Sequence, residues 1–256
     1  MSEQVTVITG ASGGIGEELA YRAARAGRKV VLVARSADKM KTVADKISSL
    51  GGKQPEIVAL DLADPNSGEA LAGVLKAKNL KVAEVVNNAG YGLAGRIEQL
   101  DVADQVGMVD LNIRALTDLT LRFLPEIIEA KGGVLNVAST AAFQPGPNMA
   151  IYYASKSYVL SFSEAIWFEL KGRARVTTLC PGPVPTGFQA RATGGKTLSL
   201  TKFSTTQSDY VADLGWRGFE AGKRVVIPGL INKVMAFFVP LTPKPLVLWI
   251  AWRLSR

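Results

Sequence analysis

Short continuous runs of apolar residues, rich in valine and isoleucine, recur along the chain and are separated by longer segments with helical spacing. Because these runs do not alternate between apolar and polar positions, they are typical of strands buried on both faces of a sheet. Strand alternating with helix predicts a parallel sheet with helices on both sides. The sequence therefore predicts a doubly wound α/β fold with strands at 5–10, 29–34, 56–60, 82–87, 133–138, 175–180 and 224–227, about seven in all. The predicted helices span 15–26, 37–50, 67–77, about 101–130, 152–171 and 208–221.

Two segments interrupt this pattern. Residues 186–207 are rich in Gly, Ser and Thr, and long irregular insertions of this kind are usually functional loops, so we expect a substrate flap there. Residues 228–256 form an apolar C-terminal extension. We therefore expect a binding and catalytic domain over 1–227 and an extension over 228–256.

The composition limits the available chemistry. In 256 residues, 48% are apolar, which is enough for a sizeable core, and there is one cysteine and no histidine. This excludes disulfide frameworks, Cys/His zinc sites and Ser-His-Asp triads, and we expect no metal site. Any catalysis must use Tyr, Lys, Ser, Asn or carboxylates. The N-terminus enters a strand pattern without a signal-peptide pattern, so we expect a cytoplasmic protein.

The net charge of +8 is unevenly distributed. Residues 1–170 hold 17 Lys+Arg and 19 Asp+Glu, whereas residues 171–256 hold 13 and 3, a balance of +10 in the last third. These cations are dispersed and lack interleaved aromatics, so we expect no nucleic-acid partner. An anionic cofactor, an anionic substrate or a membrane surface fits this charge better.

A glycine-rich turn follows the first predicted strand, with glycines at Gly10, Gly13, Gly14 and Gly16. A nucleotide pyrophosphate needs a tight turn without side chains, followed by free N–H groups at a helix N-terminus. Taken alone, the turn is a weak signal, and a plain strand-to-helix connection is an alternative. Its place after the first strand of an alternating pattern favours nucleotide binding.

The form TGxxxGxG resembles the short-chain dehydrogenase/reductase family. The resemblance continues through Asn87-Asn88-Ala89-Gly90, Asn112, Ser139, Tyr152-x-x-x-Lys156 and Pro181-Gly182. It implies a Rossmann-like fold and an oxidoreductase that transfers hydride between a nicotinamide cofactor and a carbonyl or alcohol. The extension looks like that of one bacterial subgroup of broad-specificity members.

The end of the second strand predicts NADP rather than NAD. An acidic residue at this point normally binds the ribose 2′-OH and repels a 2′-phosphate, but here Ala34 is followed by Arg35. Arg35, Ser36 and Ser12 can donate hydrogen bonds to a phosphate, although a solvated loop arginine is an alternative. Asp61-Leu62 matches the family position that contacts adenine, and Asp61 is equally consistent with a turn cap. The resemblance implies further cofactor contacts by Ile15, Asn88, Ala89, Gly90, Pro181, Gly182, Val184 and Thr186.

Tyr152 and Lys156 are four residues apart on a predicted helix, so their side chains share a face. A phenol has a pKa of about 10, and a nearby ammonium favours the phenolate and lowers that pKa. Ser139 lies at the carboxyl end of a predicted strand, where open α/β sheets bind ligands. Tyr153 also shares a helix face with Lys156, so spacing alone does not choose between the tyrosines. The resemblance selects Tyr152.

The resemblance implies a role for each catalytic residue. Lys156 would hold the nicotinamide ribose and tune Tyr152, Tyr152 would protonate the substrate oxygen, and Ser139 would hydrogen-bond that oxygen. Asn112 would hold a water between Lys156 and solvent, although an Asn within a helix is equally able to bond backbone. Cys180 ends a buried strand and is expected to pack as a small hydrophobe.

The expected substrate lining is mostly apolar and consists of Tyr91, Phe143, Gln144 and Phe188. It predicts an NADPH-dependent reductase of a hydrophobic ketone or aldehyde. A reductase of 3-oxoacyl chains on an anionic carrier and a non-catalytic NADP-binding redox sensor are the alternatives. We expect a homo-oligomer, a dimer or tetramer. Residues 228–256 are too interrupted by proline and lysine to span a bilayer, and they are consistent with peripheral membrane contact, burial on another subunit or a cap on the cleft.

Overall fold

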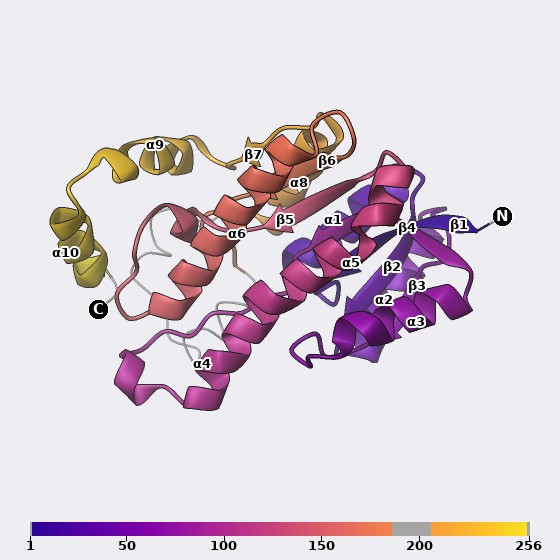
Figure 1. The fold of residues 1–256 in the computed structure, drawn as a ribbon, viewed down its shortest axis with the longest axis horizontal. Coiled ribbons are helices and arrows are strands. Elements are labelled where there is room, and N and C mark those ends of the chain that lie inside the picture. Colours follow the sequence, from indigo (N-terminus) through magenta and orange to yellow (C-terminus); the bar gives the residue numbers. More distant parts are fainter. Residues whose placement is uncertain (1, 186–205, 255–256) are drawn as a thin grey trace.

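The computed structural model describes residues 2–185 and 206–254 (Figure 1). One sheet of seven strands has the order β3-β2-β1-β4-β5-β6-β7, and all paired strands are parallel, which confirms the predicted doubly wound fold. Its order reverses between β1 and β4, and ligands of open α/β sheets bind at the carboxyl ends near such a reversal. The strands are β1 (Glu3–Thr9), β2 (Lys29–Ala34), β3 (Glu56–Ala59), β4 (Leu80–Asn87), β5 (Gly133–Val137), β6 (Arg175–Leu179) and β7 (Val225–Val226).

Helices connect the strands and cover both faces of the sheet (Figure 1). In the described residues they are α1 (Gly14–Arg25), α2 (Ala37–Ser49), α3 (Ser67–Ala77), α4 (Val102–Val109), α5 (Leu116–Glu129), α6 (Ala150–Glu169), α8 (Ser208–Glu220), α9 (Leu230–Phe238) and α10 (Lys244–Leu254). Short 3₁₀ turns lie at η1 (Ile97–Gln99), η3 (Thr140–Phe143) and η5 (Val239–Leu241), and a π-helical turn, η2, spans Asp110–Ala115.

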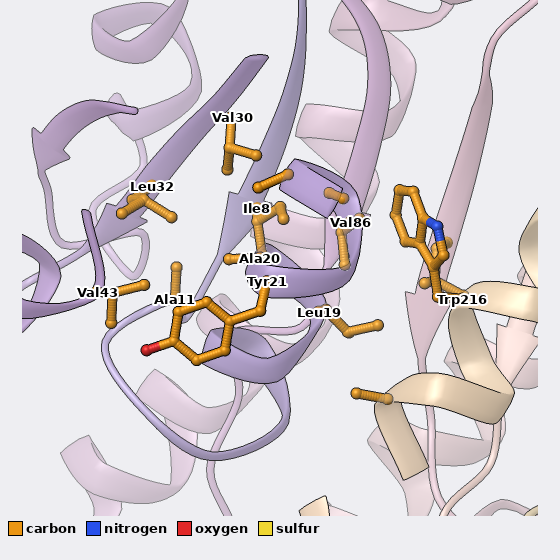
Figure 2. Packing of buried hydrophobic residues seen from close by; sticks show 14 of the residues in the cluster. Ile8, Ala11, Leu19, Ala20, Tyr21, Val30, Leu32, Val43, Val86 and Trp216 are labelled. Carbon is orange, nitrogen blue, oxygen red and sulfur yellow. The ribbon is translucent and has the colours of Figure 1, made fainter. Parts of the chain in front are cut away.

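The core consists of an apolar layer on each face of the sheet. One layer joins α1, α2 and α8 to the strands, and Figure 2 shows Leu19 and Tyr21 of α1 and Trp216 of α8 in it. The opposite layer joins α3 and α5 to the same strands through residues such as Leu71 and Phe123. Full burial of a large apolar side chain contributes about 1.5–3 kcal/mol. These layers stabilise the strands, whose carboxyl ends carry the polar residues of interest.

The helix expected over about 101–130 is confirmed as a continuous helical run over 102–129, in which the π turn at 110–115 lies between α4 and α5. The structure corrects the predicted elements in one place. The extension, for which no element was predicted, contains α9 and α10. The predicted flap at 186–207 lies outside the described residues except for positions 206 and 207.

Candidate active site

The glycine-rich turn lies between the end of β1 and the start of α1. Gly10 has φ +65°, and a Cβ on it would lie 2.8 Å from Asn88 Nδ2, so the turn requires glycine there. A Cβ on Gly16 would lie 2.3 Å from the Gly10 carbonyl oxygen, which lets α1 pack closely against the turn. Gly13, by contrast, is exposed and would place a Cβ within 4 Å of nothing. The space in front of the α1 N-terminus is therefore open to a phosphate.

Asn88 fastens the two central strands together at their carboxyl ends. Its Nδ2 donates to the carbonyl oxygens of Thr9, at 2.9 Å, and Gly10, at 3.3 Å. The backbone N–H groups of Asn88 and Ala89 both donate to the Thr9 hydroxyl, at 2.9 and 3.0 Å. These hydrogen bonds hold the end of β4 against the end of β1, which explains why the predicted Asn88-Ala89-Gly90 segment lies against the glycine-rich turn.

The carboxyl end of β2 presents a cation to solvent. Ala34 is buried, while the Arg35 side chain is 62% exposed, with Nη1 3.9 Å from Asp61 Oδ2. Asp61 Oδ1 also accepts from the Ala63 backbone N–H at 3.0 Å, so Asp61 has the turn-capping contact that was one of its two interpretations. An exposed guanidinium with one distant carboxylate partner is free to reorient toward an anionic ligand.

Arg114, which sequence reasoning missed, holds the loop that follows β3. Its Nη2 donates to the carbonyl oxygens of Leu62, Ala63 and Asp64 at 2.9, 3.0 and 2.8 Å. The Leu62 side chain is buried in the core, so any contact of Leu62 with a cofactor falls to its backbone. No motif marks Arg114, because a guanidinium that binds carbonyls has no fixed spacing in sequence.

The structure brings Ser139, Tyr152 and Lys156 together at the carboxyl end of β5. Lys156 is 6% exposed, and its Nζ donates to the Val137 carbonyl oxygen at 2.8 Å and lies 6.0 Å from the Tyr152 ring centroid. Ser139 hydrogen-bonds with Tyr152, and its hydroxyl accepts from the Ala141 N–H at 3.1 Å. One face of α6 therefore presents a phenol and an ammonium beside a hydroxyl.

Tyr153 lies in a different environment, which separates two residues that spacing alone could not. Its ring packs against Gly146, where a Cβ would approach to 2.3 Å, and its phenol hydrogen-bonds with Gln144. The Gln144 side chain, predicted to face substrate, is thus used by Tyr153. The contact with Ser139 belongs to Tyr152.

Burial shifts the pKa of both ionisable groups in this cluster. Burial raises the pKa of Tyr152 to about 12; the hydrogen bond with Ser139 lowers it and Tyr153 raises it to smaller extents. Burial lowers the pKa of Lys156 to about 8, opposed by the Cys180 thiol. Burial has the largest influence on the pKa of Tyr152 in this arrangement, and the lowering expected from the Lys156 ammonium stays a prediction. The phenol is protonated at neutral pH and can therefore donate a proton.

Asn112 lies in the π turn and is almost fully buried. Its Oδ1 accepts from the Tyr91 N–H at 3.1 Å, and its Nδ2 donates to the Tyr91 carbonyl at 2.9 Å and to Ser155 Oγ at 3.0 Å. The side chain thus bonds backbone, as the alternative interpretation held, but the backbone belongs to the segment after β4. π turns within helices are frequently found at functional sites.

The segment after β6 completes the cluster. The Pro181 carbonyl oxygen accepts from the Thr140 N–H at 2.9 Å, and the Ser139 hydroxyl lies 3.4 Å from it. Val184 is buried in the core, so its backbone is the part available to a cofactor. Cys180 is fully buried, as predicted. The remaining predicted residues of this region, Thr186 and Phe188, lie outside the described residues.

The lining predicted for the substrate is only partly available to it. Tyr91 is buried and its hydroxyl donates to the Asp104 carbonyl at 2.6 Å, so this side chain holds α4. Phe143 packs partly buried against Ala142 and its neighbours. A pocket that sequence reasoning missed opens beside the first turn of α6, with mostly apolar lining from Leu93, Ile97, Leu100, Met108, Met149 and Ile151.

Comparison with known proteins agrees with this geometry. Residues 4–196 match the family model described as short chain dehydrogenase. A sulfoacetaldehyde reductase of Chromohalobacter salexigens is 35% identical over 193 residues, which cover 73% of this chain and 75% of that protein. An 11-beta-hydroxysteroid dehydrogenase-like protein (4A) of Arabidopsis thaliana is 33% identical over 72% of this chain and 62% of its own length.

A solved structure of a short-chain dehydrogenase matches this chain over more of its length. The short-chain dehydrogenase from Sphingobium yanoikuyae in complex with NADPH superimposes with a TM-score of 0.80 at 29% identity, covering 92% of each chain. The chain therefore belongs to the short-chain dehydrogenase/reductase family of oxidoreductases.

Proposed function

We propose that the chain is an NADPH-dependent carbonyl reductase, reversible as an alcohol dehydrogenase. The observation that carries this proposal is the cluster in which Ser139 hydrogen-bonds with Tyr152 and the Lys156 Nζ lies 6.0 Å from the Tyr152 ring centroid. A phenol that keeps its proton at neutral pH suits the reduction direction, because carbonyl reduction consumes one proton at the oxygen.

The described residues fit a nicotinamide dinucleotide. The open space at Gly13 accepts a pyrophosphate at the α1 N-terminus, and the exposed Arg35 accepts a 2′-phosphate where an acid would repel it. Ser12 and Ser36 are partly exposed hydroxyl donors near the same turns. The NADPH bound to the Sphingobium yanoikuyae relative supports the same choice. When bound, the cofactor supplies the hydride.

Each residue of the cluster has one task. Tyr152 donates its proton to the carbonyl oxygen, and Ser139 donates a hydrogen bond to that oxygen. The Lys156 ammonium, buried without a carboxylate within ion-pair distance in the described part of the chain, holds ribose hydroxyls and stabilises the phenolate that the proton transfer leaves. Asn112 fixes the segment after β4 that borders this cluster.

We propose a hydrophobic ketone or aldehyde as substrate. The apolar side chains of Met149 and Ile151, which adjoin Tyr152 at the start of α6, favour such a compound. The hydroxysteroid for which the Arabidopsis relative is named supports this class, whereas the sulfoacetaldehyde for which the Chromohalobacter relative is named is a small anionic aldehyde. A cytoplasmic homo-oligomer, a dimer or tetramer, remains our prediction for the working form.

A panel assay of NADPH oxidation tests the activity and the substrate together. The panel holds lipophilic ketones and aldehydes, sulfoacetaldehyde and a 3-oxoacyl thioester, the last two standing for the competing substrates. Tyr152→Phe should reduce turnover by at least about 100-fold, the usual contribution of a general acid, and still bind NADPH. The matched variant Tyr153→Phe should keep most of the turnover. Equal turnover by the wild type and Tyr152→Phe would refute the mechanism, and NADPH binding without turnover of any compound would favour the redox sensor.

A further inference from the structure

The C-terminal arm, residues 228–254 with α9, η5 and α10, exposes an unusual number of large apolar side chains. Figure 1 shows it at the opposite end of the molecule from the N-terminus. The exposed residues are Leu230, Ile231, Val234, Met235, Phe237, Phe238, Leu241, Leu246, Leu248, Trp249, Ile250 and Trp252. Monomeric soluble proteins rarely leave apolar patches of more than a few hundred Å² exposed, so this surface needs a partner.

The charge of the same segment selects the kind of partner. From position 228 to the C-terminus there is no Asp or Glu, while Lys233, Lys244 and Arg253 lie among the apolar side chains. The Arg253 guanidinium lies 5.0 Å from the Trp249 ring centroid. Two copies of the arm packed on each other would bring like charges together, which opposes association. An anionic apolar surface complements both properties.

We propose that the C-terminal arm docks the protein on the surface of an anionic lipid bilayer. The two short helices lie in the headgroup region, with the phenylalanines and tryptophans inserted and the cations at the anionic headgroups. No helix among residues 2–185 and 206–254 is long and apolar enough to cross a membrane, so the contact is peripheral.

The arm packs against the candidate active site through Asn232, the buried residue of α9, because a Cβ on Gly182 would lie 2.6 Å from its Nδ2. The same Nδ2 donates to the Pro228 carbonyl at 2.7 Å, which fixes Asn232 within the arm. Helix α9 also contacts η3, which carries Phe143. The lipid-binding surface therefore lies at the catalytic end of the sheet. The inference about substrate rests on the proposed function: a carbonyl compound dissolved in the bilayer would reach Tyr152 from the membrane side.

Co-sedimentation with vesicles tests the docking. The full chain should sediment with vesicles of equal parts phosphatidylcholine and phosphatidylglycerol, and much less with phosphatidylcholine alone. Salt should weaken the binding, because charges separated by more than roughly 10 Å are screened at 0.1 M. Binding to neither kind of vesicle, or equal binding to both, would overturn the proposal.

Two matched pairs of variants locate the surface. Phe237→Ser should weaken vesicle binding by at least about tenfold, the effect of losing one buried aromatic side chain. Phe168→Ser, at an exposed position on α6, should leave it unchanged. Lys233→Gln should weaken binding by about fivefold, and Lys41→Gln on α2 should not. Equal effects within either pair would contradict the assignment to the arm.

Two further readouts separate this proposal from its rivals. The Tyr152→Phe variant should bind vesicles as the wild type does, so a failure of the proposed reductase would leave the docking result intact. Analytical ultracentrifugation without lipid should give the same oligomer for wild type and Phe237→Ser. Dissociation of that oligomer by Phe237→Ser, together with no vesicle binding by the wild type, would show that a second copy covers the arm.

Discussion

Lys156 is a cation that folding buries, and replacing it with methionine should make the protein more stable at neutral pH. The side chain is 6% exposed, and its Nζ donates to the Val137 carbonyl oxygen at 2.8 Å. Burial lowers its pKa from 10.5 to about 8, so the folded state disfavours the charged form. Methionine keeps most of the aliphatic stem and a similar helix propensity while removing the charge.

The magnitude and the pH range follow from the two pKa values. At about 1.4 kcal/mol per pKa unit, charging Lys156 in the folded state costs roughly 3 kcal/mol below pH 8. Between pH 8 and 10.5 the folded protein has lost this proton and the unfolded chain has not, so the cost falls with rising pH and is absent above 10.5. The loss of the hydrogen bond to Val137 lowers the free energy of unfolding of the variant by about 1 kcal/mol at every pH. Lys156→Met should therefore be about 2 kcal/mol more stable at pH 7 and about 1 kcal/mol less stable at pH 10.5.

Urea unfolding followed by far-ultraviolet circular dichroism at pH 7, 9 and 10.5 measures these differences. Lys41→Met, on the exposed face of α2, is the control and should change the free energy of unfolding by less than about 0.5 kcal/mol at each pH. A Lys156→Met variant that is less stable than the wild type at pH 7, or whose difference from the wild type does not change with pH, would refute the reasoning.

Three further predictions concern the cofactor groove. Arg35→Gln should weaken NADPH binding by about 1.5–3 kcal/mol and NADH binding little, as measured by nicotinamide fluorescence; equal losses would make Arg35 a solvated loop residue. Gly13→Ala should leave urea unfolding unchanged but weaken NADPH binding, whereas Gly16→Ala should destabilise the fold by about 2 kcal/mol or more, because its Cβ would lie 2.3 Å from the Gly10 carbonyl. The affinity for NADPH should fall as Lys156 loses its proton above pH 8. If the affinity is the same at pH 7 and pH 9, Lys156 does not have this role.

The fold could be predicted because the burial of its strands leaves a simple pattern in the sequence. Strands buried on both faces are mostly apolar, so each of the seven left a short run rich in apolar residues, although β4 and β6 also bury Glu84, Thr177 and Thr178. The π turn at 110–115 left no such signal, since its helical periodicity continues that of α4 and α5. Helices α9 and α10 were missed because most of their apolar residues face solvent, so their sequence does not resemble that of a helix packed on the core.

Site residues could be predicted where the backbone or the chemistry requires one residue type. They could not be predicted where a side chain is defined only by the contact that it makes in the fold. Gly10 and Gly16 are dictated by backbone geometry, and Ser139, Tyr152 and Lys156 were named through family resemblance. Arg114 could not be found, because carbonyl oxygens are present in every loop. Asn232 had a detectable signal, as the one amide in the apolar helix α9, and its burial against Gly182 explains it.

Buried charge is paired with opposite charge at one end of the sheet and unpaired at the other, and this difference points to the functional end. Near the amino ends of β5 and β6, Glu84 is 2% exposed and is held by Arg28 at 3.2 Å, Arg175 at 2.8 Å and the Thr6 hydroxyl at 2.7 Å. Removing one partner of such a compensated network is costly, but the network itself leaves no charge for a ligand. At the carboxyl end of β5, Lys156 is buried with a carbonyl oxygen as its hydrogen-bond partner and, in the described part of the chain, without a carboxylate within ion-pair distance. A fold stabilised only by its apolar layers has no use for that cation. Its uncompensated charge supports our proposal that the ribose hydroxyls of a nicotinamide dinucleotide bind there.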